Sequence, residues 1–188
     1  MIVVITVAAV YFLTSKNNTD LPASKREPKA HASWATHYTD VEDITDNSDL
    51  IVIGTVIDSI PEKRVNMIFT MQVIKIEKYI KGEKVPDDTV KVLQTGGELN
   101  GEKTYAFEDA PLFKINDKYL LFLEKTSEGH YLVAGGYQGS GKIVNGKVRF
   151  NVESDNIAKV FDKKRLEDVE ALFNEDLGKD NDSEDTGQ

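Results

Sequence analysis

The stretch Met67–Ile80, MIFTMQVIKIEKYI, limits the fold of this chain more than any other. It is rich in β-branched residues and has no helical period, so it predicts a long β-strand. Its apolar residues fall mainly on odd positions up to Val73 and on even positions from Ile74 onward. Because successive residues of a strand face opposite sides, this change predicts a bulge or strong coil at Val73-Ile74. A strand whose buried face changes halfway is typical of a small curled barrel, where one strand serves both sheets.

Two further stretches, Leu50–Ile57 and Lys118–Leu123, are almost wholly apolar and predict buried strands. Gly54, inside the first, indicates a kink or a close backbone approach. The segment Ser59–Lys63, which contains a proline, is predicted to turn the chain into the long strand. The second stretch has no polar residue between its flanking charges, so it needs cover on both faces. We expect the barrel interior to cover one face and a helix packed outside to cover the other.

Capping and turn signals place the remaining elements. Thr39 and Glu42 have capping-box spacing, which predicts a short helix with Thr39 as its N-cap. Apolar residues within Leu166–Phe173 recur on one face of a second helix. Asn145-Gly146 between two β-branched stretches is the strongest short hairpin signal. The glycine-rich segment 135–141 is predicted to be a mobile turn between strands.

The two ends of the chain differ from the middle. Ile2–Leu13 carries no charge, and as a helix it would span roughly 18 Å, short of a hydrocarbon core of roughly 30 Å. We therefore interpret residues 1–14 as a signal peptide or membrane anchor, with a buried core segment as the alternative. Residues 15–35 are polar and predict a disordered tether, residues 36–176 the folded domain, and residues 177–188 an acidic disordered tail.

Composition excludes several classes of function. The 188 residues suit one ordinary domain with appendages. The absence of cysteine removes disulfides, thiol catalysis and cysteine zinc sites. A net charge of −9 argues against a nucleic-acid partner held by phosphate contacts.

No motif predicts a catalytic, cofactor or metal site. Residues 136–142 satisfy GxxxxGK, but Ile143 follows where a phosphate loop needs Ser or Thr and then a helix. The three histidines are scattered along the sequence, so they predict no metal cluster. No pair of acids and no serine elbow has the spacing of a hydrolase.

Four stretches, in order, resemble a widespread group of poorly characterised bacterial extracytoplasmic domains, many of them anchored by a signal segment or a lipid. The stretches are Ser48–Val56 (SDLIVIGTV), Val73–Gly82 (VIKIEKYIKG), Gly96-Gly97 and Ala110–Leu123 (APLFKINDKYLLFL). The resemblance covers about residues 40–152. At fold level this group is similar to the OB-like barrel of netrin and tissue-inhibitor-of-metalloproteinase modules, which implies a five-stranded barrel with added helices. Those inhibitors hold zinc through an N-terminal cysteine, which this chain lacks.

Together these features predict a mainly β fold, an OB-like five-stranded barrel with an extra C-terminal hairpin and flanking short helices. We expect a non-enzymatic binding module of a Gram-positive-like cell envelope, secreted or tethered to the membrane by its N-terminal segment. Its partner would be a protein or an envelope polymer. A secreted hydrolase, or a peptidase accessory or inhibitor-like domain, is the alternative. Because OB barrels bind across strands two and three and the flanking loops, the candidate binding residues are Arg64, Gln72, Lys75, Tyr105, Phe107 and Tyr137.

Overall fold

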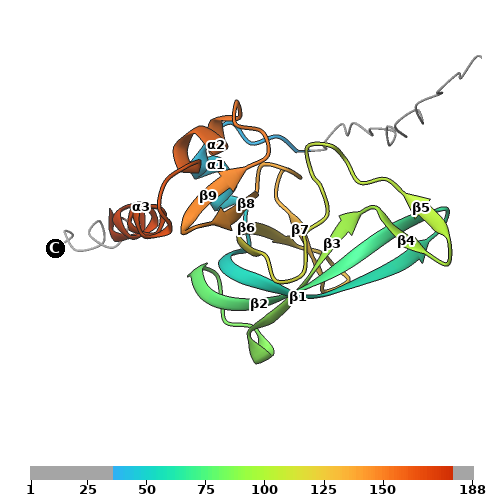
Figure 1. Cartoon of the computed structure of the whole chain (residues 1–188). Coiled ribbons are helices and arrows are strands. Elements are labelled where there is room, and N and C mark those ends of the chain that lie inside the picture. The colour runs from blue at the N-terminus through green and yellow to red at the C-terminus, as the bar shows by residue number, and fades with distance from the viewer. Residues whose placement is uncertain (1–35, 180–188) are drawn as a thin grey trace, which may run out of the picture.

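The computed structural model describes residues 36–179, and it is dominated by β-strands with short helices at the edge (Figure 1). The predicted leader and tether, residues 1–14 and 15–35, lie outside the described residues. The barrel strands are β1 (Leu50–Arg64), β2 (Met67–Lys81), β3 (Thr89–Thr95), β6 (Lys118–Lys125) and β7 (Tyr131–Val133). The other elements are α1 (Val41–Asp46), the 3-10 turn η1 (Pro86–Asp88), β4 (Gly97–Leu99), β5 (Glu102–Thr104), β8 (Ser140–Val144), β9 (Lys147–Phe150), α2 (Asn156–Phe161) and α3 (Leu166–Lys179).

The strand order closes a five-stranded barrel. The neighbours run β1-β2-β3-β7-β6, and β6 pairs back onto β1 from Leu50↔Leu123 to Thr55↔Lys118. β3 and β7 are parallel, whereas the other barrel pairs are antiparallel. The β8–β9 hairpin extends the sheet from the start of β6. The mainly β prediction, with an OB-like barrel, a C-terminal hairpin and flanking helices, is confirmed.

The predicted change of face at Val73-Ile74 is wrong. β2 turns its even-numbered residues inward from Ile68 to Ile76 without a break. A register shift does lie opposite Val73-Ile74, but the extra residue is Ile57 on β1. The prediction failed because the apolar odd-numbered residues at the start of β2 lie outside the barrel, while the polar Thr70 and Gln72 lie inside it.

The change of face occurs a few residues later, at Glu77. The register moves from Gly54↔Ile76 to Ile53↔Lys78, so Glu77 has no residue opposite it on β1. After this bulge Tyr79 packs against the barrel interior and Ile80 against the outer core. β2 therefore serves two faces as expected of a curled barrel strand, with the bulge near its end.

The predicted turn at Ser59–Lys63 is also wrong, because β1 continues through Pro61 to Arg64 and the chain turns after that residue. Pairing with β6 ends at Thr55, so the later part of β1 is an edge strand, where proline is tolerated. Gly54 does mark a close approach as predicted. A Cβ there would lie 2.6 Å from Ile74 Cγ2 and 2.8 Å from the Lys75 carbonyl oxygen.

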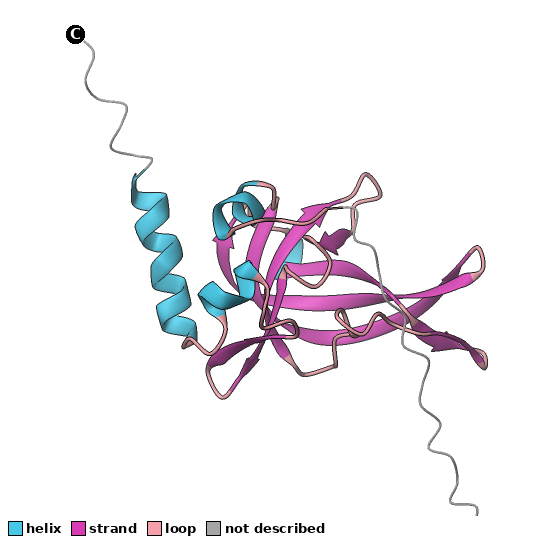
Figure 2. Ribbon diagram, turned by 90° about the horizontal axis from the view of Figure 1, so that it is seen from above, coloured by secondary structure: helices cyan, strands magenta, loops and turns pink. Residues whose placement is uncertain are grey.

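β6 separates two hydrophobic cores. Tyr119, Leu121 and Leu123 face the barrel interior, where they pack with β1, β2 and β3. Leu120 and Phe122 face outward and are fully buried under the helices. Figure 2 shows the helices gathered at one side of the sheet, away from the long β1–β2 hairpin. The expected helix cover on the outer face of β6 is confirmed. The outer core comprises Tyr38, Ile44, Ile51, Ile53, Leu120, Phe122, Ala134, Val148, Phe150, Ile157, Ala158, Phe161, Val169 and Phe173.

The helix and hairpin signals are mostly correct to within a residue. The N-cap of α1 is Asp40, one residue after the predicted Thr39, and its Oδ1 accepts from Asp43 N at 2.9 Å. Asn145 and Gly146 have φ of 51° and 72°, which confirms the hairpin turn. α3 runs to Lys179 and so includes the first residues of the predicted acidic tail, and residues 180–188 lie outside the described residues. The short helix α2 was not predicted.

Truncating either of the adjacent leucines Leu120 and Leu121 is expected to be costly, because both are fully buried, one in each core. Leu120→Ala and Leu121→Ala should each lower the free energy of unfolding by about 2–5 kcal/mol. Urea melts of the purified protein measure this loss. Leu132→Ala is the control, since its side chain is 42% exposed. A loss of only a few tenths for one of the buried leucines would contradict the two-core arrangement.

Candidate binding face

Apolar side chains lie in a row on the outer face of β1, β2 and β3. Ile60 pairs with Met71, and Met71 pairs with Leu93, so these three side chains stand side by side across the strands. Ile60 is 47% exposed, and none of the three belongs to either hydrophobic core. We call this row and its apolar neighbours on β2 the apolar strip; it consists of Ile60, Met67, Phe69, Met71, Val73 and Leu93.

The opposite, inner face at this end of the sheet is covered by the β4–β5 hairpin. Ile68 N donates to Thr104 Oγ1 at 2.8 Å, and Thr70 Oγ1 donates to the Gly96 carbonyl at 2.7 Å. Lys63 Nζ lies 2.5 Å from Glu102 Oε2 on β5. The inner face is therefore polar and closed, whereas the helices that cover the outer face elsewhere pack on β6 and not on the strip.

Charged residues lie at both ends of the strip. Arg64 donates from Nε to Glu62 Oε1 at 2.6 Å and from Nη1 to Glu128 Oε2 at 3.1 Å, so it joins the end of β1 to the β6–β7 turn. Lys75, at the other end, donates to the Asp87 carbonyl at 2.7 Å. Both predicted cations thus flank the strip.

Gln72, the third candidate on these strands, does not lie near the surface as predicted. Its side chain is fully buried in the barrel, where Nε2 donates to the Phe113 carbonyl at 3.4 Å. Its Oε1 has no hydrogen-bond partner. The placement failed because the alternation of β2 was assigned to the wrong face: the polar residues of this stretch point inward.

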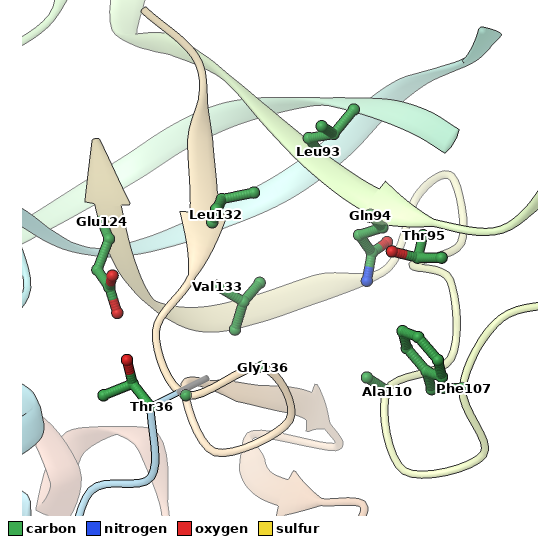
Figure 3. Close-up of a pocket in the computed structure, with 11 residues that line it drawn as sticks. Thr36, Leu93, Gln94, Thr95, Phe107, Ala110, Glu124, Leu132, Val133 and Gly136 are labelled. Carbon is green, nitrogen blue, oxygen red and sulfur yellow. The ribbon is translucent and has the colours of Figure 1, made fainter. Parts of the chain in front are cut away.

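A groove opens beside the strip, at the seam between β3 and β7. It has a volume of about 280 Å³, and Figure 3 shows Leu93 and Leu132 on its upper wall and Thr36 at its lower end. Leu93 belongs to both the strip and the groove, so the two form one continuous surface. The lining residues are Thr36, Leu93, Gln94, Thr95, Phe107, Ala110, Glu124, Leu132, Val133, Gly135 and Gly136.

The edge of β3 faces this groove with backbone polar groups. Gly96 N donates to the Ile68 carbonyl at 3.0 Å, and antiparallel alternation then turns the N–H and C=O of Thr95 away from β2. On that side β7 pairs with β3 at Val92 alone among the described residues. The loop that follows β5 lies against this end of β3, since a Cβ built on Gly96 would stand 2.7 Å from Ala106 N and the next residue, Phe107, is a β-bridge residue.

A buried anchor fixes the chain where it leaves the groove. The Gln138 side chain accepts from Tyr38 N at 2.9 Å and donates to the Tyr38 carbonyl at 2.8 Å. Tyr38 OH donates to Glu124 Oε1 at 2.8 Å. Gly135 has a φ of 57°, and a Cβ there would lie 3.1 Å from the Tyr38 ring. The glycine-rich segment is thus a tight, largely buried turn, and the prediction of a mobile one is not supported.

The remaining predicted residues lie apart. Phe107 lines the groove. Tyr105 does not line the groove, and Lys103 Nζ stands 4.7 Å from its ring centroid. Tyr137 OH is 3.3 Å from Asp155 Oδ2, next to the anchor. The structure therefore brings one of these aromatics to the groove and not the other two.

Sequence reasoning missed the residues that make the surface. Ile60, Leu93 and Leu132 were not among the candidates, although the odd-numbered apolar residues of β2 carried a signal for the strip. The odd-numbered apolar residues of β2 were interpreted as core, because apolar alternation does not say which face of a barrel strand is outside. No local pattern indicates the pairing of Gln138 with Tyr38, which are far apart in sequence.

The groove offers few ionisable groups. Glu124 is the one ionisable side chain among the groove-lining residues, and Tyr38 already donates to it. Within residues 36–179 no group of three His, Asp or Glu side chains is placed to hold a metal ion. Lys142 of the GxxxxGK string lies in strand β8 and pairs with Asp117 Oδ2 at 2.5 Å, so this string does not form a phosphate loop.

Comparison with protein families, curated proteins and solved structures finds no match to this chain. Among the helices of the described residues, none is both long and apolar enough to cross a membrane.

Burial and the neighbouring Glu124 carboxylate raise the pKa of Tyr38 above its ordinary value near 10. The folded protein therefore keeps the Tyr38 proton at a pH where the unfolded chain loses it. The stabilisation is complete below about pH 10 and declines as the pH rises further. We expect Tyr38→Phe to reduce the loss of unfolding free energy between about pH 9 and pH 11, measured by urea melts. An unchanged slope would show that Tyr38 is not buried in solution.

Proposed function

We propose that this protein is a membrane-tethered, extracytoplasmic binding module of a bacterial cell envelope, and that the apolar strip is its contact surface. The observation that carries the proposal is the in-register row Ile60, Met71 and Leu93, which belongs to neither hydrophobic core and in which Ile60 is 47% exposed. A contiguous exposed apolar patch with charged residues at its rim is typical of an interaction site. The strip also lies on the face that OB-like barrels use for binding.

The chemistry of the strip favours a protein partner over an envelope polysaccharide. A polysaccharide would bring many hydroxyl groups against Ile60, Met71 and Leu93, which offer no hydrogen bonds in return for lost water. Methionine side chains are flexible and polarisable, and they adapt well to apolar protein surfaces. Both methionines of the described part, Met67 and Met71, lie on this strip. A partner that presents an apolar segment with polar flanks fits this surface.

The extracytoplasmic location is supported by the sequence of the N-terminal segment. Ile2–Leu13 is uncharged and is followed by a polar stretch that can act as a tether. The net charge of −9 disfavours the nucleic-acid ligands that many OB-like barrels bind.

An amine-reactive label that does not cross membranes tests the location. The domain carries exposed lysines such as Lys91 and Lys147, so in intact producing cells the protein should be labelled as fully as after lysis. A cytoplasmic protein in the same sample is the control and should be labelled only after lysis. Labelling of this chain that also requires lysis would overturn the extracytoplasmic proposal.

A photo-crosslinking residue at Ile60 tests the contact surface. In the producing cells, Ile60→benzoylphenylalanine should give a discrete adduct with one partner protein, because this side chain is the most exposed of the row Ile60, Met71 and Leu93. The matched control is the same residue at Val144, which is 39% exposed against 47% for Ile60 and lies on the β8–β9 hairpin. Adding Met71→Glu should abolish the Ile60 adduct without shifting the thermal melt. Equal adducts from both positions would contradict a binding role for the strip.

A further inference from the structure

The groove has acceptor oxygens at one end and apolar walls along the rest of its length. Glu124 and Leu132 stand opposite each other across β6 and β7, so the carboxylate lies beside an aliphatic side chain. Figure 3 shows the Glu124 carboxylate and the Thr36 hydroxyl at the same end of the groove, away from Leu93. The lining is therefore amphipathic, with one negative charge at its polar end.

The Glu124 carboxylate is only partly used within the domain. Its Oε1 accepts a hydrogen bond from Tyr38 OH at 2.8 Å. Because a carboxylate has two acceptor oxygens, Oε2 can accept a further hydrogen bond. Among residues 36–179 no lysine, arginine or histidine side chain forms an ion pair with Glu124. The described part of the chain thus leaves this charge without a counter-charge.

A second carboxylate strengthens the negative potential at this end of the groove. Burial and Glu124 are the larger causes of the raised pKa of Tyr38, and Asp43 of α1 adds to them through space. Lys125 follows Glu124 in β6, so its side chain points to the opposite side of the strand. A cation that enters the groove is therefore attracted by two carboxylates and meets no positive side chain among the lining residues.

The volume of the groove limits the size of a ligand. A cavity of roughly 150 Å³ can hold a benzene molecule. The groove, at about 280 Å³, therefore admits one ring together with a short chain. Leu93, Leu132 and Val133 supply aliphatic walls for the ring. These side chains offer no hydrogen bonds, so a ligand with many hydroxyl groups would lose its contacts with water here.

We propose that the groove binds an organic cation in which a short chain joins a primary ammonium to an apolar group, with the ammonium at Glu124 and the apolar group between Leu93 and Leu132. An ammonium has three donors, which serve Glu124 Oε2, the Thr36 hydroxyl and one water molecule. Hydrogen bonds to a charged group are stronger than neutral ones. The inference goes beyond the proposed function, because it does not require the strip to bind a partner.

Two probes of nearly equal shape, 2-phenylethylamine and the neutral 2-phenylethanol, test whether the ligand must be a cation. Each is titrated into the purified full chain, and the methyl NMR signals of Leu93, Leu132 and Val133 report binding in the groove. We expect saturable shifts, with the amine bound about tenfold more tightly than the alcohol. Equal affinity for the two probes, or no saturable shift from the amine at millimolar concentration, would overturn the proposal.

A pair of charge-removing substitutions assigns the preference to Glu124. Glu124→Gln removes the charge but keeps an oxygen that can accept from Tyr38 OH, and it should lower the affinity for the amine to that for the alcohol. Glu98→Gln is the matched control, because it changes the net charge equally at an exposed position of β4 that does not line the groove. It should leave both affinities unchanged.

A lysine placed opposite Glu124 gives a second test. Leu132 is 42% exposed, so Leu132→Lys should fold, and its own ammonium should take the place of the ligand's and abolish amine binding. Ile57→Lys should not do so, since Ile57 is 51% exposed on β1 and does not line the groove. Thermal melts establish that each variant is folded. A preference for the amine that persists in Glu124→Gln, or amine binding that persists in Leu132→Lys, would contradict the proposal.

Discussion

The whole structure depends on the burial of β6 on both of its faces. Leu121 and Leu123 fill the barrel, while Leu120 and Phe122 pack under the helices. β6 is also paired along both edges, with β1 on one side and with β7 and β8 on the other. β6 therefore contacts the barrel strands, the C-terminal hairpin and the helices, and its apolar run joins them into one unit.

The need to bury the outer face of β6 explains where the helices pack. It also explains why they leave another part of the barrel surface without helices. The rings of Phe122, Phe161 and Phe173 lie 5.6–6.0 Å apart from centroid to centroid, which locks α2 and α3 onto β6. The helices pack on this one region of the sheet. The helices do not reach the outer face of β1, β2 and β3, where the apolar side chains of the strip are half-buried or exposed.

The groove has a related origin in the barrel seam. Among the described strands β3 and β7 are the one parallel pair. β7 is only three residues long, and the seam closes at a single residue pair, Val92↔Tyr131. A barrel with a longer seventh strand would bury the end of β3 and have no groove there. The hydrogen bonds of Tyr38 with Gln138 and Glu124 hold the start of the described chain beside this opening.

The sequence alone determined which stretches are strands and that the fold is a small barrel with helix cover. Uninterrupted apolar runs such as Tyr119–Leu123 need burial on both faces, and turn residues such as Asn145-Gly146 act locally, so both are readable from a single sequence. The apolar phase of β2 did not locate the change of face, because the odd-numbered apolar residues before Ile74 lie outside the barrel.

Only the tertiary structure decided which face of each strand is inside. Gln72 was placed near the surface and Met71 in the core, and the reverse holds, since the β4–β5 hairpin closes a polar interior at that end of the barrel. The pairing of Gln138 with Tyr38, the extra residue at Ile57 and the short β3–β7 seam likewise arise from contacts between segments far apart in the sequence. Local pattern carries no information on such contacts, because their energy depends on which surfaces the closed barrel brings together.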